Sequence, residues 1–152
     1  MSLSLSTRSR YGVRFMLVLA LDWGGGSTLL RSISRREGIS EKYLGQIAIP
    51  LKAAGLVSAQ RGSRGGYVLS RPPAEITVLQ VVEAIEGRLV PVPCTVGGGA
   101  DGVPACGRMS ECAASTVWKS LKGDIERSLA SHTLAELAAE ARRSVPVANY
   151  AI

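Results

Sequence analysis

Blocks of hydrophobic residues, each closed by glycine, organise the first half of the chain. Residues 9–23, SRYGVRFMLVLALDW, predict a helix that stops at the three glycines of residues 24–26. Beyond Arg14 this helix is apolar on almost every side. Because a helix that is apolar all round has to be buried, we expect more than one layer to cover it, from its own domain or from a partner subunit.

Two shorter helices are predicted next, with a tight turn at Gly38 between them. The first lies within residues 27–37 and places Leu29, Leu30 and Ile33 on one face. Gly38 suits the left-handed conformation that commonly ends a helix. Two short helices joined by such a turn form a helix-turn-helix.

The second helix of this pair has the clearer amphipathic pattern. Ser40 stands at its N-cap, and Gly55 follows its end. Its core-facing residues recur with the helical period: Leu44, Ile47 and Leu51. Pro50 removes one backbone donor inside the helix, so we expect a kink or an irregular last turn without loss of the helix.

A β-hairpin and a capped helix follow. Residues 56–72 contain two short strand patterns on either side of RGSRGG, residues 61–66. Thr77 and Gln80 then form the capping box of a helix that stops at Gly87. A helix, a helix-turn-helix and a hairpin in this order predict a winged helix. In such a domain the second helix of the turn enters the major groove of DNA, and the hairpin reaches the adjacent backbone or minor groove.

The second half of the chain predicts one long helix and one short helix. Apolar residues spaced three and four apart mark one face of the long helix, as in a helix–helix seam: Ala114, Trp118, Leu121, Ile125 and Leu129. Thr133 and Glu136 form a second capping box. It opens a short final helix through Leu134, Leu137 and Ala141.

Together these elements predict a mainly α fold with a small β-hairpin wing, that is, a winged helix-turn-helix plus a long dimerisation helix. We expect a winged-helix DNA-binding domain at residues 1–88 and a cysteine-containing loop at 89–112. The dimerisation helix and the short final helix occupy 113–143, and a tail occupies 144–152.

Positive charge is concentrated in the part of the chain that holds the winged helix. The whole chain has a net charge of +6. Residues 1–75 carry eleven Lys and Arg against four Asp and Glu, or +7, whereas residues 76–152 carry seven against eight, or −1. A basic half with a predicted helix-turn-helix favours double-stranded DNA as the partner.

The beginning of the chain imitates a signal peptide, with Arg8 and Arg10 before the apolar residues 15–21. Arg14 interrupts this pattern, and Asp22 stands where the small residues of a cleavage site belong. No apolar stretch approaches the length of a membrane span. We therefore expect a cytoplasmic protein with no membrane association, in which thiols stay reduced.

All three cysteines lie in one glycine-rich segment, CTVGGGADGVPACGRMSEC, residues 94–112, with the spacing C-x11-C-x5-C. Three is an odd number for disulfides and one ligand short of a tetrahedral metal site. In a reducing compartment such a cluster indicates metal binding or redox sensing. We predict no enzymatic activity, because no second histidine or convergent acid–base set accompanies Cys106 or Cys112 as a nucleophile.

Several segments resemble the Rrf-two (IscR-type) family of bacterial winged-helix regulators: RYGVRFMLVLA, ISEKYLGQI, LKAAGLVSAQRGSRGGYVLSRPPAEITV and VVEAIEG. The resemblance covers about residues 5–120, and includes a glycine-rich wing before a Pro-Pro turn and clustered cysteines before a Trp-containing helix. It implies a homodimer that crosses over through the long helix. Many members bind a [2Fe–2S] or [4Fe–4S] cluster in the loop before that helix. These regulators alter transcription of iron–sulfur, nitrosative-stress or sulfur-metabolism genes. Members without the cysteines sense by other means.

The predicted DNA-reading helix carries four polar or aromatic residues away from its core stripe: Ser40, Lys42, Tyr43 and Gln46. Lysine can reach phosphate or guanine, and glutamine can pair with adenine, whereas Ser40 also has the structural role of an N-cap. IscR-type members carry a base-reading glutamate one residue before this glutamine. Gly45 stands there instead, so we expect a different target sequence.

The wing and the first helix supply further candidate DNA contacts. An arginine at a hairpin tip can enter a narrow minor groove, where the negative potential is concentrated. We expect the wing to contact DNA through Arg61, Ser63, Arg64 and Gly65. Arg10, with Arg8 and Arg14, is expected to face phosphates or the second domain of the dimer.

The resemblance implies that Cys94, Cys106 and Cys112 hold an iron–sulfur cluster, and we favour [2Fe–2S] over [4Fe–4S]. Ser115 takes the place of the histidine ligand of IscR-type members, and His132 lies about five turns further along the helix. The fourth ligand stays open among Glu111, Asp101, Ser115, a solvent molecule and a residue of the other subunit.

Other sensing chemistries stay open as well. The three thiolates suit a zinc site, or a thiol switch without metal. The alternative to cluster sensing is a winged-helix regulator without a cluster, controlled by a partner protein, a metabolite or thiol oxidation.

Overall fold

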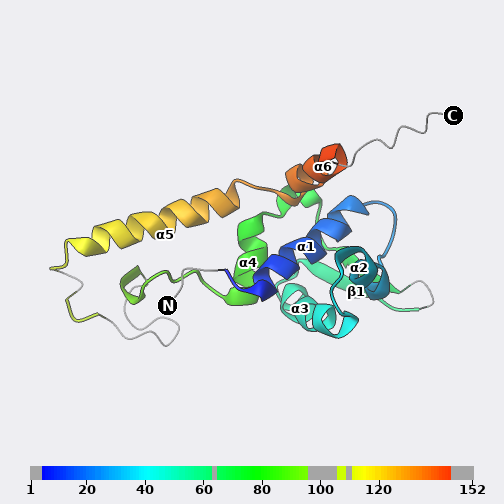
Figure 1. The fold of residues 1–152 in the computed structure, drawn as a ribbon, viewed down its shortest axis with the longest axis horizontal. Helices are drawn as coiled ribbons and strands as arrows, with labels where there is room; N and C mark the ends of the chain where they lie inside the picture. Colours follow the sequence, from blue (N-terminus) through cyan, green and yellow to red (C-terminus); the bar gives the residue numbers. More distant parts are fainter. Residues whose placement is uncertain (1–4, 63–64, 96–105, 109–110, 145–152) are drawn as a thin grey trace.

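A computed structural model describes residues 5–62, 65–95, 106–108 and 111–144. Its helices and strands are shown in Figure 1. In chain order they are α1 (Thr7–Leu21), α2 (Leu30–Glu37), α3 (Glu41–Ala53), β1 (Val57–Gln60), β2 (Gly66–Leu69), α4 (Val78–Glu86), α5 (Ala114–Ala130) and α6 (Leu134–Ser144). Two short 3-10 turns complete the set, η1 (Pro73–Glu75) and η2 (Pro93–Thr95). The predicted mainly α fold with a small hairpin wing is confirmed.

The first helix is the centre of the core. Phe15 and Met16 of α1 are fully buried, and α1 packs against α2, α3, α4, α6 and β2. The expected cover of more than one layer is therefore confirmed, and this chain itself supplies it. The helix begins at Thr7 and ends at Leu21, because Ser6 caps its first turn and Asp22 closes its last.

The helix-turn-helix is formed by α2 and α3. Gly38 adopts the left-handed conformation at φ 66°, and the Ser40 hydroxyl accepts a hydrogen bond from the Tyr43 backbone N–H. Helix α3 continues through Pro50 to Ala53, so the expected survival of this helix is confirmed. The prediction that Leu29 shares a helix face with Leu30 and Ile33 is wrong. It is the N-cap residue of α2 and its side chain is 42% exposed, because the helix begins only at Leu30.

The wing is a two-stranded antiparallel hairpin in which Val57 pairs with Leu69 and Gln60 with Gly66. Its base is joined to the loop before α2 by two further backbone hydrogen bonds. The Thr28 N–H donates to the Tyr67 carbonyl, and the Tyr67 N–H donates to the Thr28 carbonyl, each with a donor–acceptor distance of 2.9 Å. The wing thus has a fixed position beside α2 at its base.

Both predicted capping boxes are present. Thr77 and Gln80 exchange hydrogen bonds at the start of α4, and Thr133 and Glu136 do so at the start of α6. Helix α6 lies against α1 and η1, with Leu134 fully buried in the core. The division of the chain into a winged-helix domain, a cysteine loop, a dimerisation part and a tail stays a prediction. Helix α6 packs on the winged-helix part of the chain.

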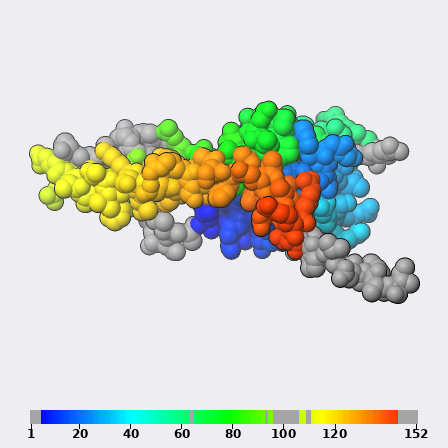
Figure 2. Space-filling model, turned by 90° about the horizontal axis from the view of Figure 1, so that it is seen from above, coloured from blue at the N-terminus to red at the C-terminus, as the bar shows by residue number. Residues whose placement is uncertain are grey.

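Helix α5 extends as an arm from this body, shown in yellow in Figure 2. Trp118 and Val117 are exposed, while Leu121, Ile125 and Leu129 are half-buried. Throughout the described residues, no helix combines the length and apolar character needed to cross a membrane.

Candidate nucleic-acid interface and cysteine segment

Lys42 and Gln46 belong to the exposed polar side chains of α3 that have no partner among the described residues. Lys42 and Gln46 are exposed, one helical turn apart. Among the described residues, neither side chain makes a hydrogen bond or an ion pair. The opposite face, with Leu44, Ile47 and Leu51, is fully buried. The core therefore fixes the direction of α3 and leaves both groups available to an external partner.

The other two residues predicted on this helix have structural roles. Ser40 is the N-cap of α3. Tyr43 is half-buried and meets Tyr11 of α1 edge to face, with ring centroids 5.9 Å apart at 88°. The Arg14 guanidinium lies 5.4 Å from the centre of the Tyr11 ring. These contacts hold α3 against α1, and Ser40 and Tyr43 stay predictions as DNA contacts.

The arginines of α1 differ in their partners. Arg14 donates to the Glu37 carboxylate and to the Glu37 backbone carbonyl, each with a donor–acceptor distance of 2.6 Å. This pairing fixes α1 to the end of α2 and neutralises a charge that was expected to face phosphate. Arg10 is exposed, and its guanidinium donates to the Thr7 hydroxyl over 3.0 Å. Arg10 therefore keeps its charge available to a phosphate.

In the wing, Arg61 is exposed, and Gly65 closes the turn through a hydrogen bond from its N–H to the Gly62 carbonyl over 2.9 Å. A Cβ at Gly65 would lie only 2.8 Å from the Gln60 carbonyl oxygen, so this turn requires glycine. Ser63 and Arg64 lie outside the described residues.

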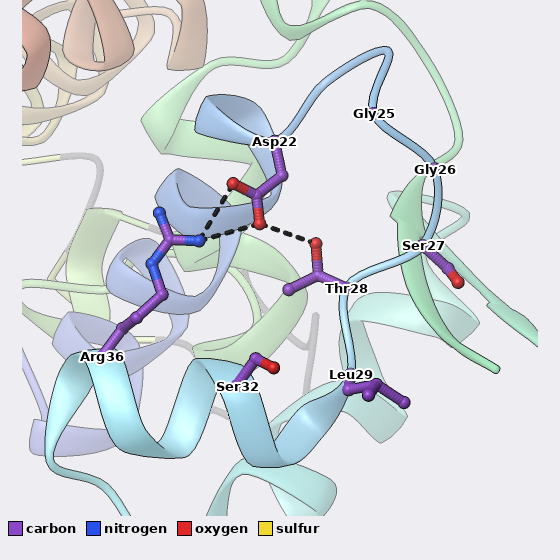
Figure 3. A pocket seen from close by; sticks show the side chains of 8 residues that line it. All are labelled: Asp22, Gly25, Gly26, Ser27, Thr28, Leu29, Ser32 and Arg36. Carbon is purple, nitrogen blue, oxygen red and sulfur yellow. Dashed lines mark hydrogen bonds and ion pairs between the residues drawn. The ribbon is translucent and has the colours of Figure 1, made fainter. Parts of the chain in front are cut away.

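A polar network holds the loop after α1, and the sequence pattern alone did not indicate it. Asp22 accepts a hydrogen bond from the Thr28 hydroxyl over 2.9 Å and pairs with Arg36 over 2.8 Å, as Figure 3 shows. A pocket of about 430 Å³ lies beside this network, between the loop and α2. Because Thr28 also pairs with Tyr67, one carboxylate connects α1, α2 and the wing.

A second network joins the first helix to the end of α4. The Glu86 carboxylate accepts hydrogen bonds from the Ser6 backbone N–H over 3.1 Å and from the Ser9 hydroxyl over 2.5 Å. Hydrogen bonds from Ser6 and then Ser9 lower the pKa of Glu86, against a smaller opposing effect of its burial. A carboxylate at the N-terminus of α1 also complements the helix dipole. Glu86 directly precedes the segment that leads to the cysteines.

The cysteines lie near the outer end of α5. Cys94 in η2 and Cys112 just before α5 are half-buried, Cys106 is exposed, and all three are free thiols. Across residues 5–62, 65–95, 106–108 and 111–144, no three His, Cys, Asp or Glu side chains are gathered closely enough to hold a metal ion. The thiols have the chemistry of iron–sulfur ligands, but their described positions do not form a site.

The fourth-ligand candidates also differ. Ser115 is 6% exposed, Glu111 is exposed, and Asp101 lies outside the described residues. His132 follows the seventeen residues of α5, roughly 25 Å along the helix axis from its start. Its backbone carbonyl accepts a hydrogen bond from the Val78 N–H. His132 is thus fixed beside α4 and away from the cysteines.

A helix-turn-helix that packs one face into the core, an exposed polar face on its second helix α3 and a wing with basic residues define a winged-helix DNA-binding protein. The comparisons with known proteins specify the family. A family model described as "Rrf2: Iron-dependent Transcriptional regulator" matches residues 5–140. The chain belongs to the Rrf2 family of transcriptional regulators.

Individual relatives agree with this assignment. Protein rrf2 of Nitratidesulfovibrio vulgaris is 35% identical over 91% of this chain and 89% of its own length. The solved structure of T. potens IscR has a TM-score of 0.74 and 35% identity, and the match covers 95% of this chain and 93% of that one. The solved structure of CymR, the global cysteine regulator of B. subtilis, has a TM-score of 0.72 and 33% identity, and the match covers 91% of this chain and 98% of that one. Several of these relatives are named as transcriptional regulators.

Proposed function

We propose that this regulator binds double-stranded DNA as a homodimer, with α3 in the major groove and the wing at the neighbouring backbone or minor groove. One observation carries the proposal. Lys42 and Gln46 project from a helix whose other face is fully buried, and they have no partner among the described residues. Gln46 reads a base, while Lys42 contacts phosphate or guanine.

Further contacts come from the wing and from α1. In the proposal Arg61 and Arg64 enter the minor groove or contact its phosphates, and Ser63 and Gly65 add DNA contacts from the same wing. Arg10 contacts a backbone phosphate from the start of α1. Ser40 and Tyr43 contact the sugar–phosphate chain where α3 begins, next to the groove.

The proposed dimer interface is the apolar face of α5. Trp118 is 37% exposed although it is a large apolar side chain, and Leu121, Ile125 and Leu129 continue its stripe. A second copy of α5 would bury this stripe, as a spacing of three and four residues permits. Two winged helices would then bind two half-sites of one operator.

We propose that Cys94, Cys106 and Cys112 ligate an iron–sulfur cluster, [2Fe–2S] in preference to [4Fe–4S]. Three free thiols within one segment, the iron-dependent description of the family model and the IscR relatives support this assignment. The bound group would supply a response to redox or iron–sulfur status. Because the described positions of the three thiols do not form a metal site, ligation requires the thiols to come closer together.

A regulator without a cluster is the second candidate. Cys106 is exposed and free, which suits direct thiol oxidation, and CymR shows that the same family includes a regulator named for cysteine. In this case the sensing group would be a thiol, a metabolite or a partner protein. The DNA-binding residues would be unchanged.

The two candidates differ in bound iron and sulfide. We expect wild-type protein that is purified and reconstituted without oxygen to be brown and to contain iron and acid-labile sulfide in every subunit. The variants Cys94→Ala, Cys106→Ala and Cys112→Ala should each lose both while keeping their circular dichroism and their dimer. His132→Ala is the matched control, and it should retain both because His132 lies at the other end of α5.

Two results would overturn the cluster. A wild-type protein that retains neither iron nor sulfide has no cluster, and a triple cysteine variant that retains both holds it elsewhere. Iron or zinc without sulfide would indicate a mononuclear site. The first outcome leaves the thiol or partner-controlled regulator as the better account, and the second shows that the cysteines are not the cluster ligands.

A further inference from the structure

One apolar side chain on α3 has no role in the core. Ile49 is 68% exposed, more than any other large hydrophobic residue among those described, whereas its neighbours Ala48 and Leu51 are buried. Single exposed apolar residues are common on protein surfaces, so the position of Ile49 decides what it means.

That position is the face of α3 proposed to enter DNA. Ile49 follows Lys42 by seven residues and Gln46 by three, so the three side chains lie along one side of the helix. The recognition helix of a homeodomain presents its base contacts at i, i+3, i+4 and i+7, which lie along one side of a helix. Counting from Lys42, these are Gly45, Gln46 and Ile49.

No contact with the described part of the chain requires glycine at position 45. A Cβ built there would meet only the Leu30 Cδ2 atom at 3.9 Å, which is an ordinary contact, and its φ is not positive. Glycine inside a helix is less stable than alanine. An unneeded glycine beside Ile49 leaves a notch on this face, into which the edge of a base pair can approach closely.

We propose that Ile49 and Gly45 form an apolar notch that reads the 5-methyl group of thymine in the major groove. Among the four base pairs, thymine is the base that presents an apolar group there. The inference rests on the proposed binding of DNA by α3 and adds a base preference to it. Gln46 selects its base through hydrogen bonds, and Ile49 selects its neighbour through apolar contact.

The test begins with the full-length dimer and a library of random duplexes, from which the tightest-binding sequence is selected. Each thymine of that duplex is then replaced by deoxyuridine, which removes only the methyl group. Wild type should lose about fourfold in affinity at one thymine of each half-site, the value expected for one buried methyl-sized group. Ile49→Ala should bind both duplexes with this lower affinity and no longer distinguish them.

Two control variants separate methyl recognition from a general effect. Ile49→Val keeps a branched apolar side chain and should still distinguish thymine from uracil. Leu29→Ala removes an exposed leucine outside α3 and should distinguish them as wild type does. Gly45→Ala should raise the thermal midpoint by about 2 °C or more, because it favours the helix, and should weaken binding of the selected duplex at least about fourfold.

The outcomes distinguish this inference from the proposed function. A selection that enriches no sequence would overturn DNA recognition by α3 and the methyl contact with it. An enriched sequence that wild type binds equally with thymine or uracil at every position would overturn the methyl contact alone. The same holds if Ile49→Ala remains as sensitive to the methyl group as wild type, or if Gly45→Ala binds the selected duplex as tightly as wild type.

Discussion

Polar side chains in the basic half of the chain fall into two groups, those that the protein itself binds and those left to a partner. Arg14 is held by Glu37 and Arg36 by Asp22, so both stabilise the positions of α1, α2 and the wing. Lys42 and Gln46 have no such contact among the described residues. The charged groups that fix the domain are thus distinct from those that would bind DNA.

Gln46 should determine sequence preference. We expect Gln46→Ala to cost about 1–3 kcal/mol on the selected duplex and little on a random duplex, because a base-reading hydrogen bond is lost only at the correct base. Fluorescence anisotropy with both duplexes measures the two losses. Equal losses on both would show that Gln46 only positions the protein on the backbone.

Arg61 should contribute affinity without sequence preference. Arg61→Ala is expected to weaken selected and random duplexes alike, and to lower the slope of log affinity against log salt by about one phosphate contact. Arg64→Ala should behave in the same way. The measurement is a salt titration of each complex, with Glu75→Ala as a variant at an exposed acidic position of the same half. Unchanged slopes in both arginine variants would contradict the role of the wing.

Glu86 should make the free energy of unfolding depend on pH in the acidic range. Its hydrogen bonds from Ser6 and Ser9 lower its pKa in the folded state, so its contribution is present above the unfolded pKa of about 4.3 and is lost as pH falls through the folded pKa. Glu86→Gln should remove at most about 1 kcal/mol at pH 7, because the carboxylate is largely exposed. Urea unfolding at pH 7 and pH 3 should show a smaller difference between variant and wild type at pH 3. An equal difference at both values would contradict the account.

At the scale of elements, local signals were predictable and long-range packing was not. Both capping boxes, the turn at Gly38 and the hairpin depend on residues close in sequence, and the structure contains all of them. The sequence did not indicate the return of α6 to α1, because that contact joins residues far apart in the chain. It did not indicate the Asp22 network either, because that network depends on the path of the loop between α1 and α2. Ile49 lies outside the stripe of Leu44 and Ile47, so the helical period alone places it away from the buried face.

Helix α5 should be the dimer interface. We expect Ile125→Glu to yield monomer or aggregate, because a charge within an apolar seam is left without a partner. Ser120→Glu is the matched control, since Ser120 is exposed and lies away from that seam on the helix. Sedimentation velocity distinguishes monomer from dimer. An intact dimer of the Ile125 variant would place the interface elsewhere.

At the scale of the whole molecule, the cysteine segment lies between the two functional parts. It follows Glu86, which is bound to the start of α1, and it leads into α5. A change in this segment can therefore reach both the DNA-binding half and the proposed dimer helix. A ligand alters DNA affinity only through unequal binding to two conformations, so control of DNA binding by the cysteines requires two arrangements of the winged helices.

We propose that the cysteines of this regulator set its affinity for DNA. The most direct test of this claim is the dissociation constant of the selected duplex without oxygen, for wild type before and after iron and sulfide are removed and for the triple cysteine-to-alanine variant. We predict that the two wild-type states differ by at least about fivefold, the lower end of ordinary allosteric coupling, and that the variant shows no difference. Equal affinity of the two wild-type states, or the same shift in the variant, would contradict the claim.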